Sequence, residues 1–262
     1  MRDYLQALEQ DAAKDPEQRA RELSKRELPK RFYKEAVPAT VEGGFAIHLD
    51  GRPVKTPSRT MLVLTHHAVA QAVADEWNAQ VEVINPAVMP LTRIANSAQD
   101  AVAKRFAEVS DEITRFCGTD ALCYRADEPE TLVARQRELW DPVLSWAEAM
   151  FGGRFVRIAG IIHQEQPEAL LKAYRARLDS FTPLGLAALH TATSLAGSAV
   201  LALALSDGHL SVEEAWLAAH VEEDFNVERW GQDEQATQVR TYKRTEFDAA
   251  ALILGMNDAA QV

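Results

Sequence analysis

The sequence lacks a long apolar run. Its longest apolar stretch, from Leu195 to Leu205, is rich in alanine and includes Gly197 and Ser198. A helix that crosses a bilayer needs about 20 apolar residues, so this stretch predicts a buried core helix and no membrane insertion. Acidic residues interrupt the N-terminal segment, namely Asp3, Glu9, Asp11 and Asp15, so we expect neither a secretory signal nor a transit peptide there. We therefore expect a bacterial cytoplasmic protein.

Cysteine is scarce in this chain. Cys117 and Cys123 are the only two, and the five residues between them fit no common zinc or redox motif. We expect both to be buried thiols that pack as small apolar side chains. A reducing compartment is consistent with this usage.

The chain also has no stripe of basic residues. Its formal net charge is −11, and the segment from Arg19 to Arg31 is of mixed sign. Proteins that bind nucleic acid need clustered Lys and Arg to neutralise phosphates. The charge distribution therefore argues against nucleic acid and anionic membranes as partners, and at most indicates a basic partner.

Motifs of catalysis and cofactor binding are missing as well. The sequence contains no G-x-G-x-x-G, no G-x-x-x-x-G-K-[ST], no G-x-S-x-G and no H-E-x-x-H. A nucleotide site usually depends on backbone donors in a glycine-rich phosphate loop. We therefore expect no enzyme, no cofactor and no catalytic residue.

The hydrophobic pattern divides the chain into three parts. Residues 1–30 form a charged arm, which the sequence describes equally well as a frayed helix or as a disordered tail. Residues 31–90 contain short, turn-punctuated apolar segments, and residues 91–262 show apolar spacing typical of helices. The sequence thus predicts an α+β fold, with a small antiparallel β-rich N-terminal domain followed by a larger, mainly α-helical C-terminal domain.

The β-rich domain is predicted to contain a hairpin. Apolar residues alternate from Phe45 to Leu49, and this period of two indicates a half-buried strand. Asp50-Gly51 follows at once and is typical of a tight turn, because glycine tolerates a positive φ. A short strand from Met61 to Leu64 and an amphipathic helix over residues 66–80 complete the domain.

Four helices of the C-terminal domain are predicted from their apolar spacing and from signals at their ends. A long helix begins after Asp127, which can cap it, and ends at Gly152, while Pro142 should kink or divide it. A very apolar helix runs from Thr182 to about Leu205. A capping box of Ser211 and Glu214 begins a further helix that continues to Trp230, and residues 233–254 form the last one. The dense β-branched segment from Phe155 to Ile162 is predicted as a strand or an extended crossing.

The most distinctive polar feature is an acidic helical stretch. Glu222, Glu223, Asp224 and Glu228 lie within one short segment that ends at Trp230. Like charges at helical spacing repel each other by roughly a few tenths of a kcal/mol per pair, so a purely structural helix gains nothing from them. Two interpretations stay open: a face that meets a basic or polar partner, and a face that only keeps the protein in solution.

The same stretch holds the strongest metal-like arrangement. His220, Glu223 and Asp224 are spaced so that they share one helix face. An imidazole beside carboxylates can hold a metal or act as a general base, but the further ligands that a metal needs are not visible elsewhere. A polar helix face is the preferred interpretation, and a small metal-dependent hydrolase is the alternative function.

Five tryptophans are spread over the helical segments. Trp140, Trp146 and Trp216 are expected to pack in the core. Trp77 and Trp230 stand at helix ends beside charged residues, where core packing and an interface role are equally compatible with the sequence.

Several short motifs, in this order, resemble those of the chaperones that hold the alpha subunit of the F1 rotary ATPase before assembly. They extend from Arg31 to about Leu254, and the charged arm lies outside the match. The matching pieces are Arg31-Phe32-Tyr33, Leu49 to Pro57, Glu76-Trp77, Pro90-Leu91-Thr92, Trp140-Asp141-Pro142 with Trp146, and Glu223 through Glu228-Arg229-Trp230-Gly231.

The resemblance implies a two-domain, non-enzymatic chaperone without a cofactor. Its client would be the unassembled F1 alpha subunit, which it would keep from aggregating until the beta subunit replaces it. A stable accessory subunit of a complex is a further alternative.

The resemblance also gives weight to particular residues, and their chemistry separates two roles. Contact with the client is expected from Glu223, Asp224, Glu228, Arg229 and Trp230. Support of the fold or of the domain junction is expected from Glu76, Trp77, Trp140, Asp141 and Pro142.

Overall fold

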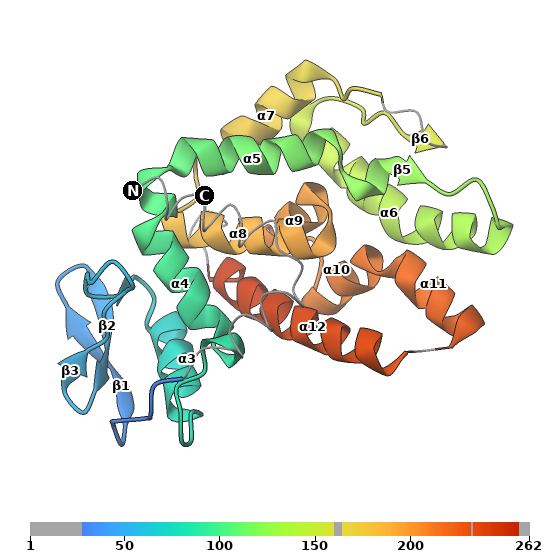
Figure 1. The fold of residues 1–262 in the computed structure, drawn as a ribbon. Coiled ribbons are helices and arrows are strands. Elements are labelled where there is room, and N and C mark those ends of the chain that lie inside the picture. Colours follow the sequence, from blue (N-terminus) through green and yellow to red (C-terminus); the bar gives the residue numbers. More distant parts are fainter. Residues whose placement is uncertain (1–27, 160–163, 232, 257–262) are drawn as a thin grey trace.

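The computed structural model describes residues 28–159, 164–231 and 233–256. Within them, a small antiparallel sheet near the N-terminus lies beside a larger body of helices (Figure 1). The α+β fold predicted from the sequence is therefore confirmed. The charged arm expected over residues 1–30 lies outside the described residues, apart from its last three.

The sheet is organised around one central strand, β2, which pairs antiparallel with the other three. The strands are β1 (Ala36–Val41), β2 (Gly44–Leu49), β3 (Arg52–Pro53) and β4 (Val63–Leu64). The predicted hairpin turn joins β2 to β3, where Asp50 has a φ of 47° and Gly51 a φ of 82°. Two successive positive φ angles define a turn whose twist matches that of the strands. β4 is shorter than predicted, because Met61 makes only an isolated bridge, with Lys55.

β1 is an edge strand whose free side is partly blocked. The side chain of Asn78 accepts a hydrogen bond from the N–H of Ala36 and donates one to its C=O, both at 2.8 Å. Two residues further along the same side of the strand, Pro38 has no N–H to offer. An edge with few free donors is a poor template for another strand, which limits association through the sheet.

Helices make up most of the rest of the described chain. They are α3 (His67–Asn78), α4 (Pro90–Asp100), α5 (Phe106–Gly118), α6 (Glu130–Phe151), α7 (Glu168–Leu178), α8 (Pro183–Ala196), α9 (Ala199–Ser206), α10 (Val212–Ala219), α11 (Val221–Trp230) and α12 (Glu234–Leu254). Short 3-10 turns cover Pro86–Val88, Val102–Lys104 and Ala121–Cys123. A two-residue parallel pair joins β5 (Tyr124–Arg125) to β6 (Ile158–Ala159), and the residues 160–163 that follow lie outside the described chain.

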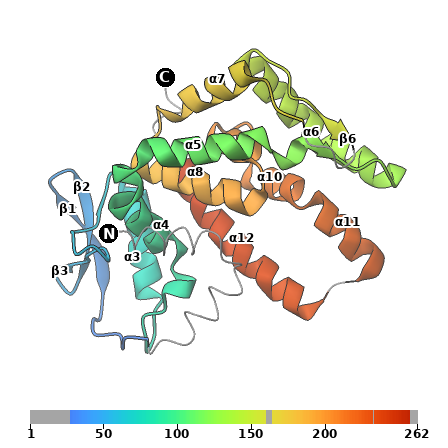
Figure 2. The same cartoon turned by 45° about the horizontal axis from the view of Figure 1, so that its top comes forward.

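The helical body is built around α8, which contacts α4, α5, α9 and α12 (Figures 1 and 2). Next to it, α9 is buried along its whole length, from Ala199 to Ser206. The apolar stretch that the sequence identifies therefore forms the centre of the core, as predicted. Cys117 and Cys123 are free and buried, also as predicted.

Two helices predicted as continuous are each divided. The apolar helix expected from Thr182 to Leu205 is two helices, α8 and α9, because Gly197 takes a left-handed φ of 64° and the Ser198 side chain caps α9. The helix that begins at the predicted capping box stops at His220 and resumes as α11. The capping box itself is present.

The long helix α6 is continuous through Pro142, so of the two effects predicted for this proline, a kink or a division, the division is wrong. Pro142 and Glu138 are both exposed, so water can satisfy the Glu138 carbonyl that loses its helical donor. Asp127 does not cap this helix, which begins after Pro129 without a side-chain cap. Its end at Gly152, with a left-handed φ of 68°, is confirmed.

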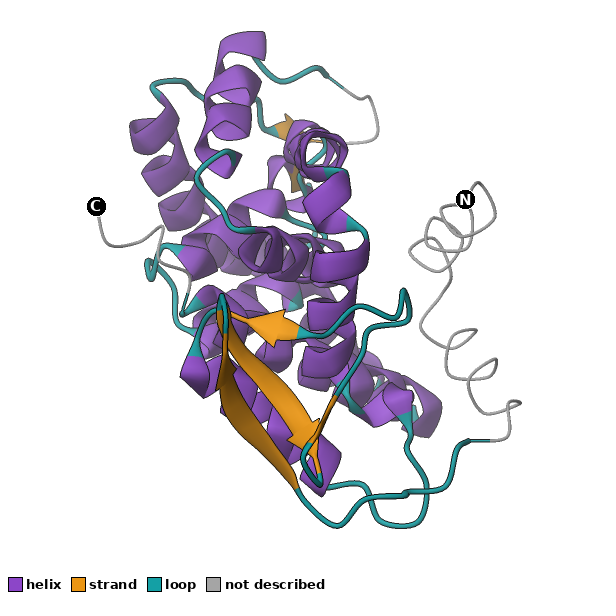
Figure 3. Cartoon of the chain, turned by 90° about the vertical axis from the view of Figure 1, so that its left-hand side faces the viewer, coloured by secondary structure: helices purple, strands orange, loops and turns teal. Residues whose placement is uncertain are grey.

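Figure 3 shows the strands on one side of the helical body. Helix α4 connects the two regions through hydrogen bonds to the β-rich segment. Near its C-terminal end, Gln99 accepts a hydrogen bond from the N–H of Val63 at 3.1 Å, and the buried Asp100 accepts one from the Thr56 hydroxyl at 2.8 Å. The same helix packs against α8 and α12. The two regions that the sequence separates near residue 90 therefore share α4 as a common element.

Candidate functional site

Glu76 and Trp77 lie near the end of α3, where it meets α4. The Glu76 carboxylate accepts hydrogen bonds from the N–H of Leu91 at 2.7 Å, the N–H of Thr92 at 2.8 Å and the Thr92 hydroxyl at 2.7 Å. It thereby caps the first turn of α4, and its burial raises the pKa of Glu76. The carbonyl of Trp77 accepts a hydrogen bond from Tyr33, whose ring stands edge-on to the indole. Both residues face the inside of the molecule.

Trp140 and Asp141 tie α6 to its neighbours. The buried Trp140 donates its indole N–H to the carbonyl of Ala218 in α10 at 2.7 Å. Arg125 lies over the Trp140 ring and forms an ion pair of 2.7 Å with Asp141. These contacts serve packing between helices and leave the indole no exposed edge for a partner.

The acidic residues of α11 are all paired within the protein. Toward α6, Glu222 accepts a hydrogen bond from Gln136 at 2.7 Å, and Glu228 accepts two from Arg135 at 2.8 and 2.5 Å. Toward α12, one arginine, Arg240, forms ion pairs with Asp224 at 2.5 Å and with Glu223 at 3.6 Å. The cationic partners lie far away in the sequence, so the acidic run alone could not reveal them.

His220 does not assemble a metal site with Glu223 and Asp224. Its ring is buried, its Nδ1 lies 2.9 Å from the carbonyl of Trp216, and burial lowers the pKa of His220. Glu223 and Asp224 turn instead to Arg240. No group of three His, Cys, Asp or Glu side chains suited to a metal occurs among the described residues. The arrangement thus gives the hydrolase alternative no support.

The tryptophans at helix ends have opposite environments. Trp77 is half-buried and packs against the core. Trp230, in contrast, is 82% exposed at the end of α11. An exposed tryptophan is costly to keep in water and is a frequent anchor in protein interfaces.

A second exposed apolar surface was not predicted from the sequence. Lys30 pairs antiparallel with Val83, and two backbone hydrogen bonds of 2.9 and 2.8 Å flank the pair. Phe32 and Val81 lie two residues from this bridge on its two segments, and Val83 is part of it. Phe32 is 69% and Val81 81% exposed. We call Phe32, Val81 and Val83 the apolar ribbon face; it joins segments that no local pattern connects.

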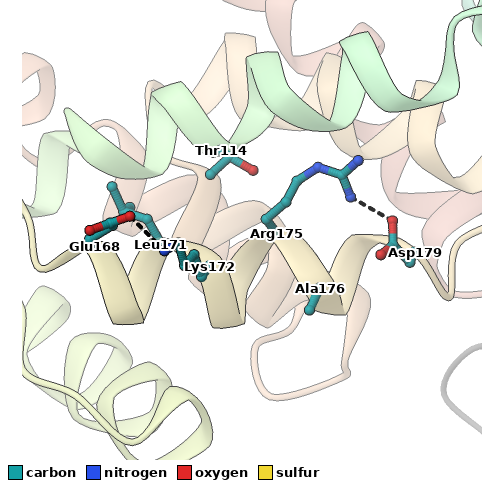
Figure 4. Close-up of a pocket in the computed structure, with 7 residues that line it drawn as sticks. All are labelled: Thr114, Glu168, Leu171, Lys172, Arg175, Ala176 and Asp179. Atoms are coloured by element: carbon teal, nitrogen blue, oxygen red, sulfur yellow. Dashed lines mark hydrogen bonds and ion pairs between the residues drawn. The ribbon is translucent and has the colours of Figure 1, made fainter.

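An open hollow of about 430 Å³ lies between α5 and α7 (Figure 4). Its charged side chains pair with each other, Glu168 with Lys172 at 2.6 Å and Arg175 with Asp179 at 2.5 Å. Arg175 also contacts Asp111 of α5 at 2.7 Å. Because the hollow is open and its charges neutralise one another at the surface, we assign no ligand to it.

Comparisons with known proteins find relatives among the chaperones. A sequence model of the family described as ATP12 chaperone protein matches residues 30–148. The mitochondrial protein atp12 of Schizosaccharomyces pombe is 26% identical over 222 residues, which are 80% of this chain and 76% of that protein. No helix among the described residues is long and apolar enough to cross a membrane.

Solved structures of bacterial proteins are similar over nearly the whole chain. The Atu1473 protein of Agrobacterium tumefaciens superposes with a TM-score of 0.83 and 47% identity, covering 97% of this chain and 96% of that one. Atp12 of Paracoccus denitrificans superposes with a TM-score of 0.79 and 37% identity, covering 89% and 99%. The chain is thus an assembly chaperone by fold and by sequence. It belongs to the ATP12 chaperone family, which serves the assembly of ATP synthase.

Proposed function

We propose that this protein binds the unassembled alpha subunit of F1 in the bacterial cytoplasm and keeps it from aggregating until the beta subunit replaces it. The proposal rests on membership in the ATP12 chaperone family and on one observation, the 82% exposed Trp230 at the end of a helix that ion pairs hold in place. No catalytic step and no cofactor enter the proposed activity.

The chemistry of an unassembled subunit explains the need for such a contact. A subunit awaiting its partner exposes large, partly apolar surfaces that promote aggregation. A chaperone that covers them must bind reversibly, so that mass action favours the final subunit contact once the partner is present. A few exposed aromatic anchors on a prepositioned frame suit this purpose better than a deep hydrophobic groove.

The proposed contact surface is the tip of α11. Trp230 supplies the apolar anchor, and Arg229 supplies a cation whose guanidinium lies over Phe225. The carboxylates of Glu223 and Asp224 stay partly exposed despite their ion pairs, so they can attract a basic region of the client. The apolar ribbon face is a second surface of suitable character on the N-terminal side of the molecule.

The test is coexpression with the alpha and beta subunits of F1 from the same organism, each supplied separately. We expect alpha, but not beta, to stay in solution and to copurify with this protein, and we expect added beta to displace it. The control is the Trp230→Ala variant, which should retain its fold and capture less alpha. Capture of neither subunit, or permanent retention in the finished ATP synthase, would contradict the proposal.

A further inference from the structure

Helix α11 has few apolar contacts to hold it. Among its ten residues only Val221 and Phe225 are buried, so its last turn depends on polar contacts with neighbouring helices. Phe225 itself is close to two guanidinium groups, with Arg229 at 4.5 Å and Arg135 at 5.5 Å from its ring centroid. Arg135 therefore reaches α11 twice, through the Phe225 ring and through the carboxylate of Glu228.

The contact between Arg135 and Glu228 has the geometry that makes an exposed ion pair effective. Two parallel hydrogen bonds of 2.8 and 2.5 Å join the guanidinium to the two carboxylate oxygens. Both side chains are partly exposed, at 41% and 56%, and a single-point ion pair in that setting contributes little. The bidentate form adds a fixed direction, because a planar fork meets a planar carboxylate in one orientation.

This direction decides where Trp230 points. Successive residues of an α-helix turn by about 100°, so residues two apart lie about 200° apart around the axis. Holding Glu228 against α6 thus turns Trp230 away from α6. Its observed exposure of 82% agrees with that placement.

We infer that Arg135 is a positioning residue for client binding, and that Glu228 acts through Arg135 by fixing the orientation of Trp230 and makes no essential contact with the client. The inference rests on the proposed function. It revises the sequence-based expectation that the charge of Glu228 meets the client directly. In this arrangement the arginine on α6 and the glutamate on α11 form one unit, and Trp230 is the residue that the client touches.

A charge swap separates the two roles of Glu228. Affinity for the purified F1 alpha subunit would be measured for Glu228→Arg, for Arg135→Glu and for the variant that carries both changes. Each single change removes the pair, and we expect it to weaken binding about three- to fivefold. The double variant restores an ion pair with reversed direction, so its affinity should return to within about twofold of the original protein. Arg137→Glu, at an exposed position of the same helix, is the matched control and should bind normally.

The outcomes are distinct. If the double variant binds as weakly as Glu228→Arg, the client recognises the charge of Glu228 itself and the inference is wrong; unaffected binding in both single variants is equally incompatible with it. Thermal unfolding of each variant shows whether it is folded. If the swap does not fold, Arg135→Ala, Glu228→Ala and the variant with both changes replace it, and the two changes together should weaken binding no more than either one alone. Absence of any binding by the original protein would instead refute the proposed function.

Discussion

The carboxylate of Glu76 on α3 accepts both the backbone and the hydroxyl hydrogen bond of Thr92 on α4, at 2.8 and 2.7 Å. One side chain thus satisfies donors at the start of the helix that links the sheet to the helical body. The N–H of Leu91 adds a third hydrogen bond, to the other carboxylate oxygen. Glu76 therefore connects two elements at the point where the chain passes from one region to the next.

Replacing Glu76 should cost stability without changing the surface. In Glu76→Gln, an amide NH2 group replaces one carboxylate oxygen. This group cannot accept a hydrogen bond, so the N–H or hydroxyl donor that faces it loses its partner. We expect the free energy of unfolding to fall by about 1–3 kcal/mol, as measured by chemical denaturation. Glu82→Gln, which makes the same change at an exposed position, should leave stability within about 0.5 kcal/mol. Equal losses in the two variants would show that Glu76 has no special role.

Much of the fold could be predicted because its signals are local. The Asp50-Gly51 turn, the capping box and the end of α6 at Gly152 each depend on residues within one turn of the chain. The prediction of one continuous helix from Thr182 to about Leu205 was wrong, because the apolar run conceals Gly197, whose left-handed backbone ends α8. The break between α10 and α11 at His220 has no signal in the local sequence pattern.

The candidate site could be predicted only in part, because its contacts join residues that are distant in the sequence. The acidic run and Trp230 are visible as a pattern, but their partners Arg135 and Arg240 lie on other helices. Whether a carboxylate is free for a client or paired within the protein depends on those long-range contacts. The apolar ribbon face depends likewise on a pairing between distant segments.

Asn78 is expected to protect the edge of the sheet as well as to stabilise it. Asn78→Ala removes both hydrogen bonds to Ala36 and exposes its N–H and C=O. We predict a loss of about 1–3 kcal/mol in the free energy of unfolding and greater self-association at high protein concentration, measured by light scattering. Gln71→Ala, which alters an exposed residue of the same helix, serves as the control. A variant that is less stable but remains monomeric would limit Asn78 to a structural role.

Replacing the buried Trp140 should lower stability far more than replacing the exposed Trp230. Trp140 is buried and donates to Ala218, so Trp140→Ala should lower the free energy of unfolding by about 3–5 kcal/mol. Trp230 is almost fully exposed, so Trp230→Ala should change it by less than about 0.5 kcal/mol. Denaturation curves for both variants provide the measurement. A large loss of stability in Trp230→Ala would identify its ring as a packing residue and remove it from the proposed contact surface.

Asp120 makes stability depend on pH. It is fully buried between α5 and α9, where its two oxygens accept hydrogen bonds from the N–H groups of Leu122 at 3.1 Å and Val200 at 3.0 Å. Burial outweighs these bonds and raises the pKa of Asp120 from 3.8 to about 6. A carboxyl with a raised pKa binds its proton more tightly in the folded state than in the unfolded state. Its contribution is therefore greatest at low pH and is lost as the pH rises from about 4 through 6, by up to about 3 kcal/mol.

Comparison with Asp120→Asn isolates this contribution from other carboxyls, such as Glu112, whose pKa is lowered and whose effect has the opposite sign. The amide does not titrate and accepts fewer hydrogen bonds, so the variant should be less stable than the original protein at pH 4.5. The difference should shrink as the pH rises to 7.5, because only the original protein then carries a buried charge. Urea denaturation at intervals across this range measures it. A difference that stays constant, or that grows with pH, would mean that Asp120 is ionised throughout and that its hydrogen bonds outweigh its burial.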